Sequence, residues 1–360
     1  MSIGKLAVNL DTDPFIRTFT IEDDGSITAL ATGGGIGSGE GSTSAALSKD
    51  QKWLSVAQSS TVIIMPWNEG SLGTEVQSGS VGSTPYAQAF ANNDSSLLAI
   101  GTRFAGVKLY RVNEDQTITL LDESTDTLDR IPEPFATVTW NSDDTRFCVS
   151  NNNGEVSLFG WDGATLTRLA RSADLGTVTA QKYLPGDSET KIFVAGAGGD
   201  VLKILDTSGD TFAEFQTNSL TDGLSSKSGI DVSVDGAYGA VGQSPDGSDP
   251  SRLVDLSDAS IPSMFPGTER WQRGAFIRSG LFVGIDDQVL NIANVYQVEG
   301  GLATLLNSTD FGDGDIVRQV MVTASTTGPT TEEQIFQATY ANASAAPPKR
   351  TALVRPLDVQ

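Results

Sequence analysis

The chain has 360 residues, of which 45 are acidic and 23 are basic, so its formal net charge is −22 at pH 7. This excess of carboxylates argues against a surface that follows nucleic-acid phosphates, because such surfaces depend on clustered Lys and Arg. The sequence holds no histidine, which excludes Ser-His-Asp and Cys-His relays and histidine-ligated zinc. We therefore expect no nucleic-acid partner.

Membrane and secretion signals are also missing from the sequence. No run approaches the about 18 consecutive apolar residues that suggest a membrane span. Asp11 and Asp13 interrupt the N-terminus before an apolar signal-peptide core can form. We therefore expect no membrane partner and no secretion by a signal peptide. The single cysteine, Cys148, lies in an alternating run and is expected to be a small core residue.

The first predicted element is a hairpin over residues 15–30, with Asp and Gly at its turn. A Gly-rich connector over residues 31–43 follows it. The run 33–41 contains a G-x-G spacing that could suggest a phosphate loop, but such a loop requires a helix directly after it. A strand near Ala46 is predicted instead, so the run is interpreted as a connector.

From residue 47 onward a short phrase recurs seven times. It consists of an apolar anchor, a polar turn rich in Asp, Asn, Ser and Gly, and an alternating strand. The anchors are Leu47, Phe90, Trp140, Leu184 and Val232, with fainter copies near Phe276 and Met321. They are spaced by about 45 residues, which is typical of one four-stranded blade of a propeller.

Each repeat continues into a second predicted hairpin, in which alternating strands flank a turn of Asp, Asn, Glu or Gly. The clearest examples cover residues 107–121, 156–169, 201–215 and 295–306. No window shows apolar residues at helical spacing. We predict an all-β chain that forms one domain over residues 1–360, a seven-bladed β-propeller of four-stranded antiparallel blades, with eight blades as the alternative.

The two ends of the chain are predicted to close the ring by strand pairing, which removes exposed sheet edges. Residues 15–30 would complete the C-terminal blade. The inner strands of that blade are expected near Met321 and over residues 334–340. Residues 351–357 are either a third strand there or an added edge.

Longer insertions and acidic turns are the candidate contact and metal sites. The insertions cover residues 124–134, 220–228, 243–252, 258–270 and 324–333, and loops of this kind commonly carry binding residues. Asp310, Asp313 and Asp315 form a dense carboxylate group that could hold calcium, although the terminal Glu of an EF-hand is missing. A solvated turn is the alternative, and no other cofactor is predicted.

The phrases at 90–101, 107–112 and 117–121 resemble blades of seven-bladed propellers of the tryptophan-aspartate-repeat and lactonase-like kinds. The first kind carries a Gly-His pair and a Trp-Asp ending in each repeat. Here histidine is absent, and Trp161-Asp162 falls in a predicted hairpin turn. The lactonase-like kind implies a catalytic site in the central channel that generally includes histidine, so no catalytic residue is carried over.

Two further resemblances concern the turns and the composition. Residues 48–53 resemble the Asp-box of sialidase-type propellers, which stabilises a turn. The abundance of Thr, Ser, Asn and Gly and the irregular loops resemble structural proteins of phage particles. This second resemblance implies a place in a virion or, failing that, in the cytoplasm.

The predicted function is that of a non-catalytic structural or adaptor propeller that contacts other proteins, as a tail or capsid-associated component of a phage virion. The candidate interaction residues, which would be exposed on a rim, are Trp67, Met264, Phe265 and Trp271, and packing in the core is the favoured alternative for any one of them. The alternative is a lactonase-like small-molecule enzyme that uses the central channel. It requires converging carboxylates, for which the candidates are Asp206, Asp255, Asp286 and Asp287.

Overall fold

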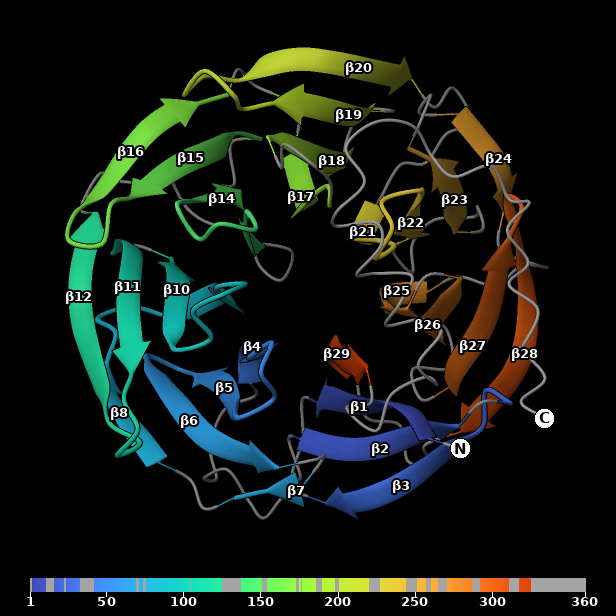
Figure 1. The fold of residues 1–360 in the computed structure, drawn as a ribbon, viewed down its shortest axis with the longest axis horizontal. Helices are drawn as coiled ribbons and strands as arrows, with labels where there is room; N and C mark the ends of the chain where they lie inside the picture. The colour runs from blue at the N-terminus through green and yellow to red at the C-terminus, as the bar shows by residue number, and fades with distance from the viewer. Residues whose placement is uncertain are drawn as a thin grey trace, which may run out of the picture.

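Seven antiparallel sheets stand around a common centre in the computed structural model (Figure 1). The structure describes residues 2–324, apart from residues 11–15, 23, 33–41, 69–70, 74–75, 104, 125–136, 151–153, 173–174, 176, 186–189, 198–200, 220–226, 244–250, 257–259, 265–270, 279, 287–291 and 311–316. Within this part no helix is long and apolar enough to cross a membrane. The prediction of an all-β propeller architecture is confirmed.

Each sheet is given below from its innermost to its outermost strand: the strand named first lies nearest the centre, and the strand named last lies at the circumference (Figure 1). The first four sheets contain β29 (Val317–Ala324), β1 (Ser2–Leu10), β2 (Ile16–Glu22) and β3 (Ile27–Thr32); β4 (Ser42–Leu47), β5 (Trp53–Gln58), β6 (Thr61–Asn68), β7 (Ser71–Leu72) and β8 (Val76–Ser80); β9 (Pro85–Phe90), β10 (Leu97–Thr102), β11 (Gly106–Val112) and β12 (Ile118–Ser124); and β13 (Val138–Trp140), β14 (Arg146–Ser150), β15 (Val156–Trp161) and β16 (Leu166–Arg171).

The remaining three sheets follow the same order. They contain β17 (Thr177–Tyr183), β18 (Lys191–Ala197), β19 (Val201–Asp206) and β20 (Ala213–Ser219); β21 (Lys227–Val232), β22 (Tyr238–Gln243), β23 (Arg252–Asp255) and β24 (Ser260–Met264); and β25 (Trp271–Arg278), β26 (Leu281–Asp286), β27 (Ile292–Glu299) and β28 (Leu302–Asp310).

Antiparallel pairing places two kinds of turn at the same end of each sheet. The outer turns join the third and fourth strands, and the inner turns join the first and second strands in every sheet except the first, where β29 and β1 are distant in sequence. We call the side of the ring that carries both kinds the turn face and the opposite side the connection face. The recurring polar phrase of the sequence forms the inner turns.

Side chains within the inner turns satisfy the backbone there. Ser48 Oγ accepts the Trp53 N–H at 2.9 Å and donates to Asp50 Oδ1 at 2.8 Å. Ser233 Oγ likewise donates to Asp235 Oδ1 at 2.6 Å. Short Ser, Asn and Asp side chains favour turns because they can bond neighbouring backbone groups in this way. The turn around Ser48 is thus structural, as its resemblance to an Asp-box implies.

The hydrophobic core lies between sheets, because both faces of a sheet are covered by its neighbours. One cluster joins Ala87 and Leu109 of the third sheet to Val138, Phe147 and Phe159 of the fourth. All six residues of β10 are buried. Strands covered on both faces appear in the sequence as nearly continuous apolar runs, which is why the second strand of each repeat was recognisable.

The first and last described strands share one sheet. β29 pairs with β1, and β1 pairs with β2. The strand next to the innermost one was expected over residues 334–340, and this was wrong, because the N-terminal strand β1 occupies that position. Residues 334–340 and 351–357 lie outside the described residues.

The described strands also correct the predicted loops. β3 extends to Thr32 and β4 begins at Ser42, so the connector is shorter than residues 31–43. The predicted insertion 258–270 contains β24, which pairs with β23 as an outermost strand. Insertions 124–134, 220–228 and 243–252 are flanked by strand ends that lie on the connection face. Insertion 324–333 lies outside the described residues from residue 325 onward.

Several outermost strands carry a β-bulge at the same place. The partner of β11 shifts from Asp122 to Leu120 between Leu109 and Tyr110. The equivalent shift in the seventh sheet runs from Asn307 to Leu305. Leu121 of β12 and Leu306 of β28 are therefore left without a partner in the pairing, and each of these two strands bends there.

Gly274 tests the packing of the seventh sheet. A Cβ at this position would lie 2.3 Å from Phe282 Cζ and 2.8 Å from the Val283 backbone oxygen. We expect Gly274→Ala to lower the free energy of unfolding by about 1–3 kcal/mol, because the surrounding backbone cannot yield without strain. Urea denaturation measures this loss. Gly209→Ala is the control, since its Cβ would meet only Thr211 Oγ1 at 3.6 Å, and an equal loss in both variants would contradict the interpretation.

Candidate functional site

Hydrogen bonds between innermost strands hold neighbouring sheets in register near the centre. Gln88 Nε2 donates to the Ser44 backbone oxygen at 2.7 Å. The Tyr183 N–H donates to Thr139 Oγ1 at 3.1 Å. Each of these bonds crosses from one sheet to the next, so the polar groups near the centre serve first to join sheets.

Asp231 occupies the same kind of position with a charged side chain. Its Oδ2 accepts the Phe276 N–H of the next innermost strand at 2.7 Å. Its Oδ1 lies 3.2 Å from Lys182 Nζ of the preceding innermost strand. The Lys182 side chain is half exposed, and Asp231 is largely buried. This carboxylate therefore links three successive sheets.

Asp144 joins the third and fourth sheets on the turn face through three hydrogen bonds. Its Oδ1 accepts the Asn92 N–H at 2.6 Å, and its Oδ2 accepts the N–H groups of Asn93 and Asp94 at 2.8 and 2.6 Å. Three successive amides of one inner turn thus surround a carboxylate of the next. Such concave groups of amides bind anions, and here the chain supplies the anion itself.

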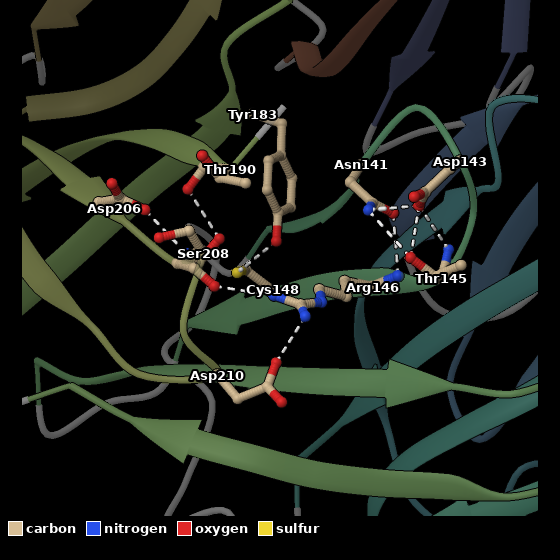
Figure 2. A network of polar contacts seen from close by, with 11 residues as sticks. Asn141, Asp143, Thr145, Arg146, Cys148, Tyr183, Thr190, Asp206, Ser208 and Asp210 are labelled. Atoms are coloured by element: carbon tan, nitrogen blue, oxygen red, sulfur yellow. Dashed lines mark hydrogen bonds and ion pairs between the residues drawn. The ribbon is translucent and has the colours of Figure 1, made fainter. Parts of the chain in front are cut away.

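Arg146 joins the fourth and fifth sheets at the turn face (Figure 2). Its guanidinium donates to the Thr207 backbone oxygen at 2.8 Å and pairs with Asp210 Oδ1 at 2.6 Å. Thr207 in turn donates through Oγ1 to the Thr190 backbone oxygen at 2.7 Å. Arg146 therefore fixes the position of an outer turn from the neighbouring sheet.

Cys148, two residues after Arg146 on β14, carries a buried thiol. Cys148 Sγ donates to Tyr183 Oη at 3.5 Å, and the Cys148 side chain is fully buried, as expected from the sequence (Figure 2). Burial raises the pKa of the Cys148 thiol to about 12, and the Tyr183 hydroxyl, which can hydrogen-bond to the thiolate, offsets part of this rise. Burial likewise raises the pKa of Tyr183. Neither group ionises near neutral pH, so neither serves as a nucleophile or base.

Two of the four carboxylates named for an enzymatic site, Asp206 and Asp255, lie away from the centre. Asp206 ends β19 and Asp255 ends β23, and these strands are the third in their sheets. Asp206 Oδ1 accepts the Ser208 N–H at 2.7 Å inside its own turn. Placing these two residues at the channel was therefore wrong. Asp286 ends β26, where its side chain is not described, and Asp287 lies outside the described residues.

The proposed calcium ligands can be placed only in part. Asp310 is exposed at the end of β28, while Asp313 and Asp315 lie outside the described residues. Within the described part of the chain, no group of three or more Cys, Asp or Glu side chains could hold a metal ion. The calcium site stays a prediction.

The tryptophans named as exposed contacts are buried. Trp67 is 2% exposed and packs beside Met65, and Trp271 is 1% exposed with its ring centroid 4.7 Å from that of Phe282. Large aromatic rings on strands covered on both faces add to the core between sheets, so the contact role is wrong for both residues and the alternative of core packing holds. Met264 ends β24 and its side chain is not described, and Phe265 lies outside the described residues.

Exposed large apolar side chains concentrate on one outermost strand instead. Among the described residues these side chains are Leu120, Val234, Leu302, Leu305 and Leu306. The last three lie on β28 and are 63%, 37% and 43% exposed. Clustered exposed apolar residues mark contact surfaces, whereas single ones are ordinary. We call Leu302, Leu305 and Leu306 the leucine edge.

The bulge in β28 breaks the alternation of side chains at two adjacent leucines. In a regular strand Leu305 and Leu306 would point to opposite faces, but the extra residue breaks the alternation at this place. The residue equivalent to Leu306 in the third sheet is Leu121, which packs against the core. Sequence reasoning missed the leucine edge because leucines in a predicted hairpin are normally core residues.

A scan against models of known families and a search of curated proteins found no match. Solved structures do match the fold. Sqt1 of Saccharomyces cerevisiae has a TM-score of 0.59 at 13% identity, over 80% of this chain and 78% of that chain. A proposed 6-phosphogluconolactonase of Bacteroides fragilis has a TM-score of 0.65 at 12% identity, over 89% of this chain and 98% of that chain. A chain of the mitotic checkpoint complex has a TM-score of 0.62 at 12% identity, over 76% and 81%.

These similarities show the fold alone, since all three identities are far below the level that carries function. They include both tryptophan-aspartate-repeat and lactonase-like propellers, which are the two kinds that the sequence resembles. The chain is a β-propeller with apolar side chains exposed at the edge of one sheet.

Asp144 tests the contact between the third and fourth sheets. Asp144→Asn keeps a residue type that tolerates its positive φ of 60°. It replaces one acceptor oxygen by an amide that faces N–H groups. We expect the free energy of unfolding to fall by about 1.5–3 kcal/mol, as for a lost hydrogen bond to a charged group. Asp115→Asn is the control, because exposed Asp115 bonds only inside its own turn, and a matching loss there would argue against the role of Asp144.

The reactivity of Cys148 reports on unfolding of the fourth sheet, in which it lies on β14. We expect the folded chain to resist iodoacetamide at about pH 8, because only the thiolate reacts and this thiol is buried and protonated. Labelling should become stoichiometric in urea above the unfolding midpoint, as measured by intact mass. Full labelling of the native chain at a rate close to that of a free thiol would show that the thiol is accessible.

Proposed function

We propose that the chain is a non-catalytic propeller that binds another protein at the leucine edge of β28. The observation that carries this proposal is the exposure of Leu302, Leu305 and Leu306 on one strand. A contact surface needs apolar groups that lose water on binding, on a support that changes little. β28 meets both conditions, since its three leucines are exposed and its backbone is paired along its length with β27.

The neighbouring solved structures support a protein partner. One of them is a chain of a multiprotein assembly, the mitotic checkpoint complex. The lactonase-like alternative draws on the Bacteroides fragilis structure, but Asp206 and Asp255 lie away from the centre and the sequence has no histidine. We therefore favour binding over catalysis.

The finer parts of the proposal concern the ring and its setting. The seven described sheets and the pairing of β29 with β1 support a seven-bladed ring closed by both ends of the chain. The role as a phage virion component and the location in a virion or the cytoplasm stay predictions. The identity of the partner tests them.

Size-exclusion chromatography with light scattering tests the proposed function. The purified chain is mixed with an extract of its source, and the co-migrating proteins are identified by mass spectrometry. We expect one partner to be retained by the wild type and by Leu120→Lys, and to be depleted by about tenfold or more in the double variant Leu302→Lys/Leu305→Lys. Leu120 is the matched control, since it is 44% exposed and precedes the same bulge on β12.

Two results would count against the proposal. A partnerless monomer at every concentration would remove the binding function, and small-molecule screening would follow. A partner that is retained equally by the double variant would place the contact elsewhere on the ring. Urea denaturation of each variant confirms that it is folded.

A further inference from the structure

Among the described residues β28 is the longest outermost strand, and no described strand pairs with its outer backbone edge. It spans nine residues, whereas β12 and β20 span seven, β3 and β16 six, and β8 and β24 five. Unpaired edges invite pairing with another chain, and proteins usually prevent it with short strands, charges or proline. β28 has the length that favours such pairing.

Four of the other outermost strands, β12, β16, β20 and β24, carry a charged residue or proline, whereas β3 and β8 carry neither and are shorter than β28 in the described residues. β12 holds Asp122 and Glu123, and Asp122 accepts the Leu166 N–H of the next outermost strand at 2.7 Å. β16 holds Arg168 and Arg171, and β24 holds Pro262. Residues 302–309 contain no charged residue and no proline. β28 is therefore long, and Asp310 at its end is its one charged residue.

Acidic side chains lie around the leucine edge. Glu299 and Asp310 are exposed at the two ends of the β27–β28 hairpin. The outer turn of the neighbouring sheet lies beside Leu306, since a Cβ at Gly25 would be 3.1 Å from Leu306 Cβ. That turn carries the exposed Asp24, whose pKa is lowered by hydrogen bonds from Ser26, through its side chain and its backbone N–H. Asp24 is thus ionised at neutral pH.

We propose that β28 binds an extended segment of another protein as an added strand, and that this segment carries alternating apolar residues with Lys or Arg near its ends. Backbone bonds to β28 would supply affinity, and the leucine edge and acidic rim would supply specificity. The inference rests on the proposed protein-binding function and specifies its partner. A second copy of the chain is disfavoured, because it would bring two acidic rims and two net charges of −22 together.

A synthetic peptide tests this inference on the full chain. The probe is a fluorescent peptide in which valine alternates with threonine and each end carries lysine, and the comparison peptide carries glutamate at both ends. We expect fluorescence anisotropy to show binding of the lysine peptide at least about tenfold tighter than that of the glutamate peptide. We expect Leu302→Lys/Leu305→Lys to weaken it by about tenfold or more, with Leu120→Lys unchanged.

Hydrogen exchange distinguishes strand addition from side-chain docking. Peptide binding should slow amide exchange within residues 302–310, and a peptide N-methylated at its valines should lose both binding and protection. Equal affinity for the lysine and glutamate peptides, no binding of either, or no added protection of β28 would overturn the inference. Dimerisation of the chain without peptide, abolished by the double leucine variant, would also overturn it, since the edge would then bind a second copy.

The two proposals can fail separately. If a natural partner depends on the leucine edge but leaves the exchange of β28 unchanged, the protein-binding function stands and strand addition is wrong. If the lysine peptide binds with protection of β28 but no natural partner is found, the site stands and the proposed function fails.

Discussion

Burial of both faces of a sheet by its two neighbours is the constraint on which the rest of this structure depends. A four-stranded sheet by itself would leave one or both faces in water, and the clusters between sheets show that apolar residues from two sheets are needed to form each core. A sheet at the end of an open row would have one uncovered face. The pairing of β29 with β1 places the first and last described strands in one sheet, and the closed ring proposed above would avoid this loss.

The same constraint determines where polar side chains are useful. Innermost strands approach each other closely, and a backbone N–H that faces the next sheet needs an acceptor there. Thr139 supplies a hydroxyl, Asp231 a carboxylate, and Asp144 a carboxylate for three amides at once. In a sequence such polar residues could indicate a catalytic or binding site, yet in this structure they hold neighbouring sheets together. Carboxylates near the centre are thus a weak indication of catalysis in this chain.

A ring of buried sheets leaves the outermost strands as the place where the backbone can still bind another chain. Most of those strands are shortened, charged or interrupted by proline, and β28 differs from them in length, composition and exposure. Its leucine edge lies on a rigid support, so that a partner would lose conformational freedom while the propeller loses little. Function in this fold would then depend on one edge and leave the centre as structural core.

The sequence by itself determined the class of fold. The spacing of the anchors, the alternation of the strands and the polar turns are local properties, and each inner turn, such as Ser48 with Asp50, is stabilised by residues close in sequence. Its composition also excluded histidine chemistry. What the sequence could not determine was the burial of Trp67 and Trp271, the use of β1 rather than residues 334–340 beside β29, and the exposure of Leu305 and Leu306. Those outcomes depend on which sheets lie side by side and on a one-residue shift in strand pairing. Both are decided by contacts between residues that are distant in the sequence, and such contacts form only in the folded chain.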